Sequence, residues 1–365
     1  MVDAMDSMAA DNPMGTDGFE FVEYAAEDTR ALELLFKAMG FSAIARHRSK
    51  DVVLYRQGEI NFLINHEPDS FARAFARVHG PSICAFGIRV ADASRAYQYA
   101  LAQQAKPYVG DSGPMELNLP AIRGIGGSLI YLIDRYGEQS IYDVDFVPLE
   151  HSSAEPVGLG LQYIDHLTHN VHPGRMDQWA SFYERIFNFK QIRYFDIDGA
   201  ATGLISRAMT SPCGKIRIPI NEPKDKKSQI QEYLDAYHGE GIQHIALGSG
   251  DIYASVEQLI ANGVQLLDIP DTYYEAVEER IPGHGEDLAR LKKTKILIDG
   301  DLAHGQGLLL QIFTETVIGP IFFEIIQRKG NEGFGEGNFQ ALFNSTVISA
   351  KAYLDMERSM FCLGI

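Results

Sequence analysis

Two histidines and one glutamate of this sequence lie in short apolar segments that indicate β-strands. His166, His244 and Glu324 each interrupt such a segment, in residues 163–167, 241–247 and 320–326. Burying an imidazole requires partners for its ring nitrogens, and burying an ionised carboxylate costs several kcal/mol unless the group is paired or binds a cation. Two strand histidines and one strand carboxylate form the ligand set of a facial triad, which leaves three positions on iron(II) for a chelating substrate and dioxygen.

Each of the three residues also has an ordinary interpretation. A single histidine is more often a surface or hydrogen-bonded core residue, and Glu324 could face water from an edge strand. Strand alternation predicts that His244 shares its face with Ile242 and Ala246. Zinc bound by His, His and Glu is the competing metal site, but the sequence has no helical His-Glu-x-x-His motif.

Other candidate groups carry weaker signals. His169 lies three residues after His166 and is expected on the opposite strand face, so His166, His169 and His172 do not form one three-histidine site. The glycine-rich segments 124–127 and 333–339 lack the strand-loop-helix context of a phosphate loop. The lysines favour a solvated surface, and the three cysteines are too few and too far apart for a disulfide framework or a cysteine-based zinc site.

The elements that must position these residues follow a repeat. A Pro, Gly and Ser-rich linker at residues 148–160 divides the chain, and strand and helix patterns return after it. Superposing the halves sets residues 20–25 against 162–167, 31–41 against 180–189, and 83–92 against 242–251. The comparison predicts four strand-helix-strands modules. It places Tyr24 and Ala85 opposite His166 and His244, so the chemistry is expected in the second half.

Composition limits the class of protein. A chain of 365 residues with 45% hydrophobic and 22% charged residues can bury two domain cores. The net charge of −17 disfavours nucleic acid and anionic membranes as partners, so small molecules are favoured. Neither an N-terminal signal pattern nor an apolar run long enough to span a bilayer is evident, and cysteine usage fits the cytosol.

Seven segments, in order, resemble the 4-hydroxyphenylpyruvate dioxygenase family, and its bacterial branch most closely. The likeness covers essentially the whole second half, whereas the first half resembles only the general vicinal-oxygen-chelate repeat. No single segment is specific, but their combination is. The segments are 163–167, 218–223, 227–231, 241–246, 309–314, 323–328 and 333–339.

Carried over residue by residue, the resemblance implies roles for individual side chains. It implies that His166, His244 and Glu324 bind one Fe(II) per subunit. It further implies a polar catalytic network and a set of substrate-binding residues around the metal. The network would comprise Ser206, Asn221, Gln229 and Gln243, and the substrate would contact Gln311, Phe313, Phe322, Phe334, Asn338 and Phe339.

The resemblance also implies a fold and an activity. The fold would be α+β with two domains, each a pair of βαβββ modules, and the C-terminal open barrel would enclose the metal. Residues 1–150 would form a domain without metal ligands that serves assembly, and residues 151–365 the catalytic domain, closed by a C-terminal helix within residues 338–360. The implied reaction converts 4-hydroxyphenylpyruvate and O2 to homogentisate and CO2 in tyrosine catabolism, in a cytoplasmic homotetramer or homodimer.

Two rival functions remain. 4-Hydroxymandelate synthase uses the same substrate and iron but oxidises the benzylic carbon. Its members tend to carry a smaller side chain where this sequence has Phe339, so Phe339 favours attack on the ring. A non-redox binding protein or lyase of the same fold is the more distant alternative, and it would not need the polar network as well as the triad.

Overall fold

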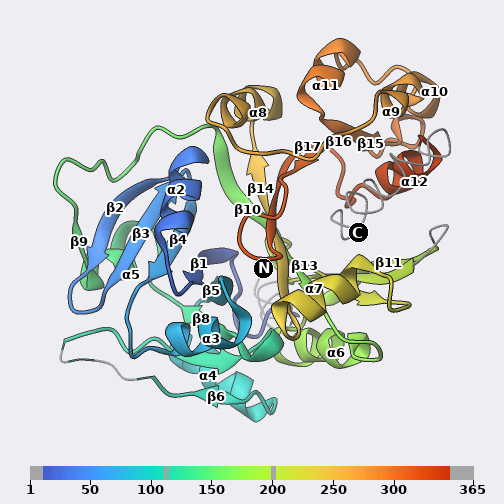
Figure 1. Cartoon of the computed structure of the whole chain (residues 1–365). Coiled ribbons are helices and arrows are strands. Elements are labelled where there is room, and N and C mark those ends of the chain that lie inside the picture. Colours follow the sequence, from blue (N-terminus) through green and yellow to red (C-terminus); the bar gives the residue numbers. More distant parts are fainter. Residues whose placement is uncertain (1–10, 111–112, 114, 199–202, 346–365) are drawn as a thin grey trace, which may run out of the picture.

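The computed structural model describes residues 11–110, 113, 115–198 and 203–345, and this part contains two β-sheets (Figure 1). The nine strands of the N-terminal sheet come before residue 149, and the eight strands of the C-terminal sheet come after residue 160. Residues 149–160, which include no strand or helix, connect the two sheets. In Figure 1 the blue and teal N-terminal sheet lies beside the yellow, orange and red elements of the second half.

The N-terminal half alternates strand groups with single helices. Its helices are α2 (Arg30–Ala38), α3 (Phe71–His79), α4 (Ala93–Ala102) and α5 (Ile141–Asp145). Its strands are β1 (Phe19–Ala25), β2 (Ser42–His47), β3 (Val52–Gln57), β4 (Ile60–Asn65), β5 (Ser82–Arg89), β6 (Pro107–Tyr108), β7 (Ala121–Arg123), β8 (Leu129–Ile133) and β9 (Phe146–Pro148).

The C-terminal half repeats this order and adds three short helices after α8. Its strands are β10 (Leu161–Asn170), β11 (Lys190–Asp198), β12 (Gly203–Thr210), β13 (Arg217–Pro223), β14 (Gly241–Ser249), β15 (Leu297–Gly300), β16 (Leu308–Phe313) and β17 (Phe322–Lys329). Its helices are α6 (Met176–Phe187), α7 (Gln229–Tyr237), α8 (Ile252–Ala261), α9 (Asp271–Glu275), α10 (Val277–Arg280), α11 (Leu288–Thr294) and α12 (Glu336–Ser345).

The strand pairing confirms the four expected βαβββ modules. In each module the last strand returns to lie parallel to the first, as β4 does beside β1 and β17 beside β14. The two modules of each half join through an antiparallel pair, β1 with β5 and β10 with β14. The C-terminal sheet has the order β11-β12-β13-β10-β14-β17-β16-β15, so its edge strands do not pair and the curled sheet stays open.

Equivalent helices of the two halves begin in the same way. The Asp92 side chain accepts a hydrogen bond from the Arg95 amide at the start of α4, and Asp251 accepts one from Ala254 at the start of α8. An aspartate at this position satisfies an amide that the first helical turn leaves without a partner. The repeat between residues 83–92 and 242–251 therefore has a physical basis in helix capping as well as in strand pattern.

The first strands of the two halves correspond in a different register from the one expected. Phe21 pairs with Gly87, and His166 pairs with Ala246, the residue equivalent to Gly87. Phe21, and not Tyr24, therefore occupies the position of His166. The superposition of residues 20–25 on 162–167 was wrong by three residues, because an apolar pattern does not by itself fix which residues of two strands pair.

The same registers identify the N-terminal counterpart of Glu324. Gly87 pairs with Tyr131 in the parallel ladder of β5 and β8, just as Ala246 pairs with Glu324 in that of β14 and β17. The expected match of Ala85 with His244 agrees with these ladders. The N-terminal sheet therefore carries phenylalanine, alanine and tyrosine at the three positions where the C-terminal sheet carries His166, His244 and Glu324.

The two halves also pack directly against each other. The rings of Phe62 and Phe323 lie 6.0 Å apart, and the 3-10 turn η1 (Ile125–Gly127) contacts β14. The carboxylate of Glu240, which precedes β14, accepts hydrogen bonds from the His172 amide and the Trp179 indole.

Among the described residues, no helix is long and apolar enough to cross a membrane.

Replacing Gly126 with alanine is expected to destabilise the packing of the two halves. Gly126 has a φ of +58°, and a Cβ atom there would lie 2.0 Å from the backbone oxygen of Glu240. We expect a loss of about 2–4 kcal/mol in the free energy of unfolding, from left-handed backbone strain and the collision together. Denaturant unfolding of the purified variant would measure it.

Gly127 supplies the matched control, because its φ is +85° but no atom lies within 4 Å of the place that a Cβ atom would take. Gly127→Ala should therefore cost only the backbone strain, about 1–2 kcal/mol. Equal destabilisation by the two variants would show that the contact between η1 and Glu240 contributes nothing to stability.

Candidate metal centre and its surroundings

Three side chains from three adjacent strands converge on the concave face of the C-terminal sheet. His166 lies on β10, His244 on β14 and Glu324 on β17, and all three are buried. Glu324 Oε2 lies 3.1 Å from His166 Nε2 and 3.6 Å from His244 Nε2. One ligand atom from each residue lies within 4.8 Å of the others, and no other such group occurs among the described residues.

Glu324 does not face water from an edge strand. Strand β17 lies between β14 and β16, and Glu324 is 2% exposed. Its second oxygen, Oε1, accepts a hydrogen bond of 3.3 Å from Gln311 Nε2. The interpretation of Glu324 as a solvent-exposed strand residue is therefore wrong, and its carboxylate has only polar protein groups to compensate its buried charge.

A bulge in β14 decides which way His244 points. Thr168 pairs with His244, but the next residue, His169, pairs with Ile242, so Gln243 is the extra residue. Because cross-strand partners share a face, His244 points to the face of Thr168 and Ile242 to the opposite face. The expectation that His244 shares a face with Ile242 was wrong, since strict alternation takes no account of the bulge.

His169 lies outside the metal group, as strand alternation predicts. Its Nε2 atom is 2.7 Å from the hydroxyl of Tyr183 on α6, so the ring faces the helix layer. Burial lowers the pKa of His169 to about 3, which leaves the ring neutral. His172 is exposed beyond the end of β10.

Asp165 and Arg328 hold the ring of His166. Asp165 Oδ1 lies 2.9 Å from His166 Nδ1, and Arg328 donates two hydrogen bonds to the Asp165 carboxylate, at 2.7 and 2.8 Å. Because a carboxylate only accepts, His166 Nδ1 donates and Nε2 faces Glu324. Burial acts to raise the pKa of Asp165, but Arg328 and His166 hold it well below its usual range. Such an outer contact fixes the tautomer of a metal-binding histidine.

The two histidines differ in electrostatic environment. Burial lowers the pKa of His244 well below its usual value, and His166 adds to this effect. Burial acts in the same direction on His166, but Glu324 and Asp165 outweigh it and raise the pKa of that ring. The charges of Glu324 and Asp165 thus favour a cation beside His166, and a metal ion bound by the three ligand atoms would supply one.

A chain of polar groups leads from Glu324 to the last helix. Gln311 donates to Glu324, and Asn338 Nδ2 donates to Gln311 Oε1 at 3.1 Å. The Tyr273 hydroxyl donates to Asn338 Oδ1 at 2.5 Å, and Arg280 donates to the Tyr273 oxygen at 2.8 Å. Helix α12, to which Asn338 belongs, is thus tied through one buried network to a residue of the metal group. Gln311 is fully buried.

Aromatic rings surround the two histidines. The ring of Phe322 stacks on His244 with centroids 4.7 Å apart, and Phe334 meets the edge of His166 at 5.4 Å. Phe313 contacts Phe322 at 6.1 Å. Phe339 belongs to α12, but its side chain lies outside the described part of the structure. Residues 346–360 of the expected C-terminal helix also lie outside it, as does Cys362.

Polar side chains extend the site along β10, β12 and β13. Asn221 pairs with Ser206 on one side and with Asn170 on the other, so the three share a face. Gln243 Oε1 lies 3.1 Å from His244 Nδ1, and Gln229 begins α7 in a half-buried position. Gln243 thus lies on a strand of the metal group, whereas Ser206 and Asn221 lie on β12 and β13, on the far side of β10 from β14.

Several buried polar atoms of this face have no hydrogen-bond partner among the described residues. They are Thr168 Oγ1, Ser206 Oγ and both amide atoms of Asn170. Buried polar groups are rarely left without a partner, and unpaired ones at one site indicate a missing ligand or water. Together with the converging ligand atoms, they show that the residues present fit a metal ion and a polar ligand beside it.

Sequence reasoning missed several of these residues. Thr168 and Asn170 follow His166 at intervals of two, and this polar alternation on a buried strand was a usable signal. Asp165, beside His166, was another. Arg328 and Tyr273 gave no comparable signal, because their contacts join residues 163 and 65 positions apart in the chain.

The fold and the site together define a class of protein. A duplicated βαβββ fold with a buried two-histidine, one-carboxylate group on a concave sheet is typical of metal-dependent enzymes of the vicinal-oxygen-chelate type. Two family profiles match the chain. "Hydroxyphenylpyruvate dioxygenase, HPPD, N-terminal" covers residues 10–147, and "Glyoxalase/Bleomycin resistance protein/Dioxygenase superfamily" covers residues 163–278.

Individual relatives define the family. The 4-hydroxyphenylpyruvate dioxygenase of Pseudomonas aeruginosa is 60% identical over 338 residues, which cover 92% of this chain and 94% of that protein. Hemolysin VllY of Vibrio vulnificus is 59% identical over 350 residues, which cover 94% of this chain and 96% of that protein. A solved xylose isomerase-like TIM barrel/4-hydroxyphenylpyruvate dioxygenase fusion protein superposes with a TM-score of 0.77 at 36% identity, over 92% of this chain and 53% of the fusion. The chain belongs to the 4-hydroxyphenylpyruvate dioxygenase family.

Loss of Arg328 is expected to weaken metal binding without removing a ligand. In Arg328→Gln the buried Asp165 carboxylate loses both guanidinium hydrogen bonds, so the orientation of His166 is no longer fixed. We expect affinity for a Co(II) probe to fall about 10- to 100-fold, as measured by titration calorimetry.

Arg217→Gln is the control, because Arg217 approaches Asp165 only at 3.7 Å and pairs mainly with Glu332 at 2.5 Å. Its Co(II) affinity should stay within about threefold of that of the unsubstituted protein, because the main partner of Arg217 is the exposed Glu332 carboxylate. A normal affinity in Arg328→Gln would contradict the positioning role of Arg328.

Proposed function

We propose that the protein is an Fe(II)-dependent dioxygenase that converts 4-hydroxyphenylpyruvate and O2 to homogentisate and CO2. The observation that carries the proposal is the buried group of His166, His244 and Glu324 within a chain of this family. In this reaction one oxygen atom enters the ring as a new hydroxyl and the other enters the shortened side chain as a carboxylate. The side chain also moves to the neighbouring ring carbon.

Iron(II) is the proposed metal because the three protein ligands leave room for a chelating substrate and a gas. A two-histidine, one-carboxylate set with three open positions is the usual site of non-haem iron oxygenases. Bound iron would supply charge neutralisation and the redox chemistry that activates dioxygen. Neutral His244, with its pKa lowered chiefly by burial, presents a free ring nitrogen without first losing a proton.

The polar side chains would hold the keto acid and its phenol. Gln243 is placed beside His244, and Gln311 beside Glu324, so both lie next to the metal ligands. We propose that Ser206, Asn221 and Gln229 bind the far end of the substrate as hydrogen-bonding groups. Neutral amides and hydroxyls suit this task, because a fixed cation here would compete with the metal for the substrate carboxylate.

The aromatic side chains would shape the site around the substrate ring. Phe322 and Phe334 already pack against the two histidines, and Phe313 lies behind Phe322. We propose that these rings, with Phe339, exclude water and hold the substrate ring close to the metal. Asn338 would keep α12 in place over the site through Gln311, so this helix would act as its closure.

The division of labour between the halves is also a proposal. Residues 151–365 would form the catalytic domain, and residues 1–150 would serve assembly into a homodimer or homotetramer. Phe21, Ala85 and Tyr131 at the positions of the three ligands support the loss of metal chemistry from the first half. The activity would serve tyrosine and phenylalanine catabolism in the cytoplasm.

Product analysis tests the proposed reaction. Protein purified without oxygen is mixed with Fe(II) and 4-hydroxyphenylpyruvate, and air is then admitted. We expect homogentisate and CO2 in equal amounts, with one O2 consumed per homogentisate. 4-Hydroxymandelate as the product would instead assign the benzylic hydroxylation, and the absence of oxygen uptake would assign a non-redox function.

Glu324→Ala tests the metal group. We expect a loss of turnover of at least about 10³-fold and a large decrease in bound iron, because a charged ligand at the metal is removed. Glu332→Ala, which changes an exposed carboxylate that pairs with Arg217, is the matched control and should retain activity. Iron content near one per chain and normal turnover in Glu324→Ala would refute the assignment.

A further inference from the structure

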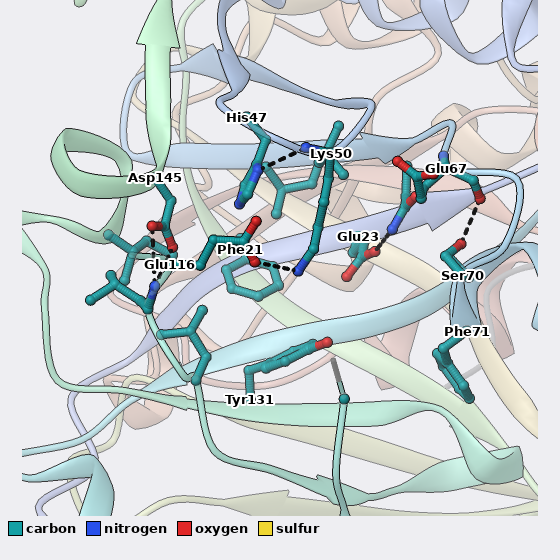
Figure 2. Close-up of a pocket in the computed structure, with 18 of the residues that line it drawn as sticks. Phe21, Glu23, His47, Lys50, Glu67, Ser70, Phe71, Glu116, Tyr131 and Asp145 are labelled. Atoms are coloured by element: carbon teal, nitrogen blue, oxygen red, sulfur yellow. Dashed lines mark hydrogen bonds and ion pairs between the residues drawn. The ribbon is translucent and has the colours of Figure 1, made fainter. Parts of the chain in front are cut away.

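A cavity of about 280 Å³ lies in the N-terminal half, outside the metal centre (Figure 2). It opens on the face of the N-terminal sheet that carries Phe21 and Tyr131, whose positions correspond to those of His166 and Glu324. The cavity is thus the N-terminal counterpart of the metal site. Its residues cannot bind a metal as the second half does, since neither a phenylalanine nor an alanine offers a ligand atom.

A buried carboxylate lies at the centre of this cavity. Glu23 extends from β1 and is 9% exposed, and it accepts a hydrogen bond of 2.7 Å from Asn65 Nδ2. Burial raises the pKa of Glu23, although Asn65 and Lys50 oppose this effect. A carboxylate without a full counter-charge in such a place is stabilised by any cation that enters.

Carboxylates outnumber cations among the lining residues. Within the described part of the chain, Lys50 is the only lysine or arginine that lines the cavity, and its Nζ atom lies 3.0 Å from Glu116 Oε2. Figure 2 shows the Lys50 side chain passing between Glu116 and Glu23. Burial lowers the pKa of His47, which favours its neutral form. The lining carboxylates are Glu23, Glu67, Asp69, Glu116 and Asp145.

Aromatic side chains also line the cavity, together with aliphatic ones. The rings of Phe21 and Tyr131 lie 5.8 Å apart in a tilted arrangement. Among the described residues, the Tyr131 hydroxyl has no hydrogen-bond partner, although Glu23 is near enough to affect its pKa, which burial raises. The rings of Phe71 and Tyr108 already have the Arg123 guanidinium over them, at 5.1 Å each. In the part of the chain that the structure describes, Phe21, Tyr131 and Phe146 line the cavity without a guanidinium over their rings, and Phe21 and Tyr131 lie on the same face of the sheet as Glu23.

This combination selects one class of ligand. An anion would meet several carboxylates and one paired lysine, and a purely apolar molecule would leave the buried Glu23 without compensation. An organic ammonium ion would gain from both the carboxylates and the π-faces of the rings. The volume lies at the lower end for ligand pockets, so it fits a molecule of roughly ten non-hydrogen atoms.

We propose that this cavity is a second ligand site, which binds a small aromatic or aliphatic primary amine. The ammonium group would lie between Glu23 and the Tyr131 hydroxyl, and the apolar part would pack against Phe21. The site is separate from the metal centre and uses a different chemistry, because it selects a cation whereas the metal selects an anion. The duplicated fold would thus carry two binding sites of opposite charge preference.

Three probes of equal size test the charge preference. The full-length protein, loaded with metal, is titrated with 2-phenylethylamine, 2-phenylethanol and phenylacetate in a calorimeter at pH 7.5. We expect the amine to bind at least about tenfold more tightly than the alcohol, and phenylacetate not to bind in this cavity. Equal binding of the amine and the alcohol, or no binding of the amine, would overturn the proposal.

Variants locate the amine. Glu23→Gln keeps an acceptor for Asn65 but removes the charge, so amine affinity should fall at least about tenfold while turnover of the metal site is unchanged. Tyr131→Phe should lower the affinity for the amine about two- to tenfold. It should leave thermal stability unchanged, because the Tyr131 hydroxyl has no hydrogen-bond partner to lose. Glu324→Ala should bind the amine normally.

Loss of amine binding in Glu324→Ala would place the amine at the metal centre and overturn the proposal. Unchanged amine affinity in both Glu23→Gln and Tyr131→Phe would do the same. If Glu23→Gln unfolds at a lower temperature, Tyr131→Phe still decides the question, because it removes a hydroxyl that makes no hydrogen bond with the described residues.

Discussion

The burial of one carboxylate determines the character of the C-terminal half. Glu324 lies on a central strand, where an unpaired negative charge costs several kcal/mol, so the surrounding residues must compensate it. His166 does so from β10 and Gln311 from β16. A bound cation would compensate the charge directly, and this is why the arrangement is suited to a metal.

The outer contacts follow from the same constraint. His166 can serve Glu324 only if its other nitrogen is held, and Asp165 and Arg328 hold it. Gln311 can donate to Glu324 only if its own oxygen is satisfied, and Asn338 of the last helix donates to it. Segments far apart in the chain are therefore joined by their contacts to one buried charge. The packing of the last helix and the electrostatics of the metal group are parts of one network.

Duplication of the fold shows which features are architectural and which are chemical. Both halves keep the antiparallel central pair, the parallel returning strands and bulges at the same positions of the central strands. Both halves also keep a buried acid at the first bulge. Glu20 pairs with Arg89 at 2.6 Å in the first half, and Asp165 pairs with Arg328 in the second. The halves differ in the side chains that the bulged strands present to the concave face. At the three ligand positions the first half carries Phe21, Ala85 and Tyr131, and two of these line the N-terminal cavity.

The sequence by itself determined the elements and the residues that could do chemistry. Apolar periodicity and the aspartate caps of α4 and α8 are local properties, so the four modules could be predicted from them. His166, His244 and Glu324 could be selected because a polar residue in an apolar strand is unfavourable wherever that strand packs. Only the tertiary structure decided the registers. The bulges at Asp165 and Gln243 reverse the facing of neighbouring residues. The pairing of Phe21 with Gly87 and of His166 with Ala246 makes Phe21, and not Tyr24, the counterpart of His166. Bulges and contacts such as Arg328 with Asp165 depend on strand pairing between distant segments, which local pattern does not record.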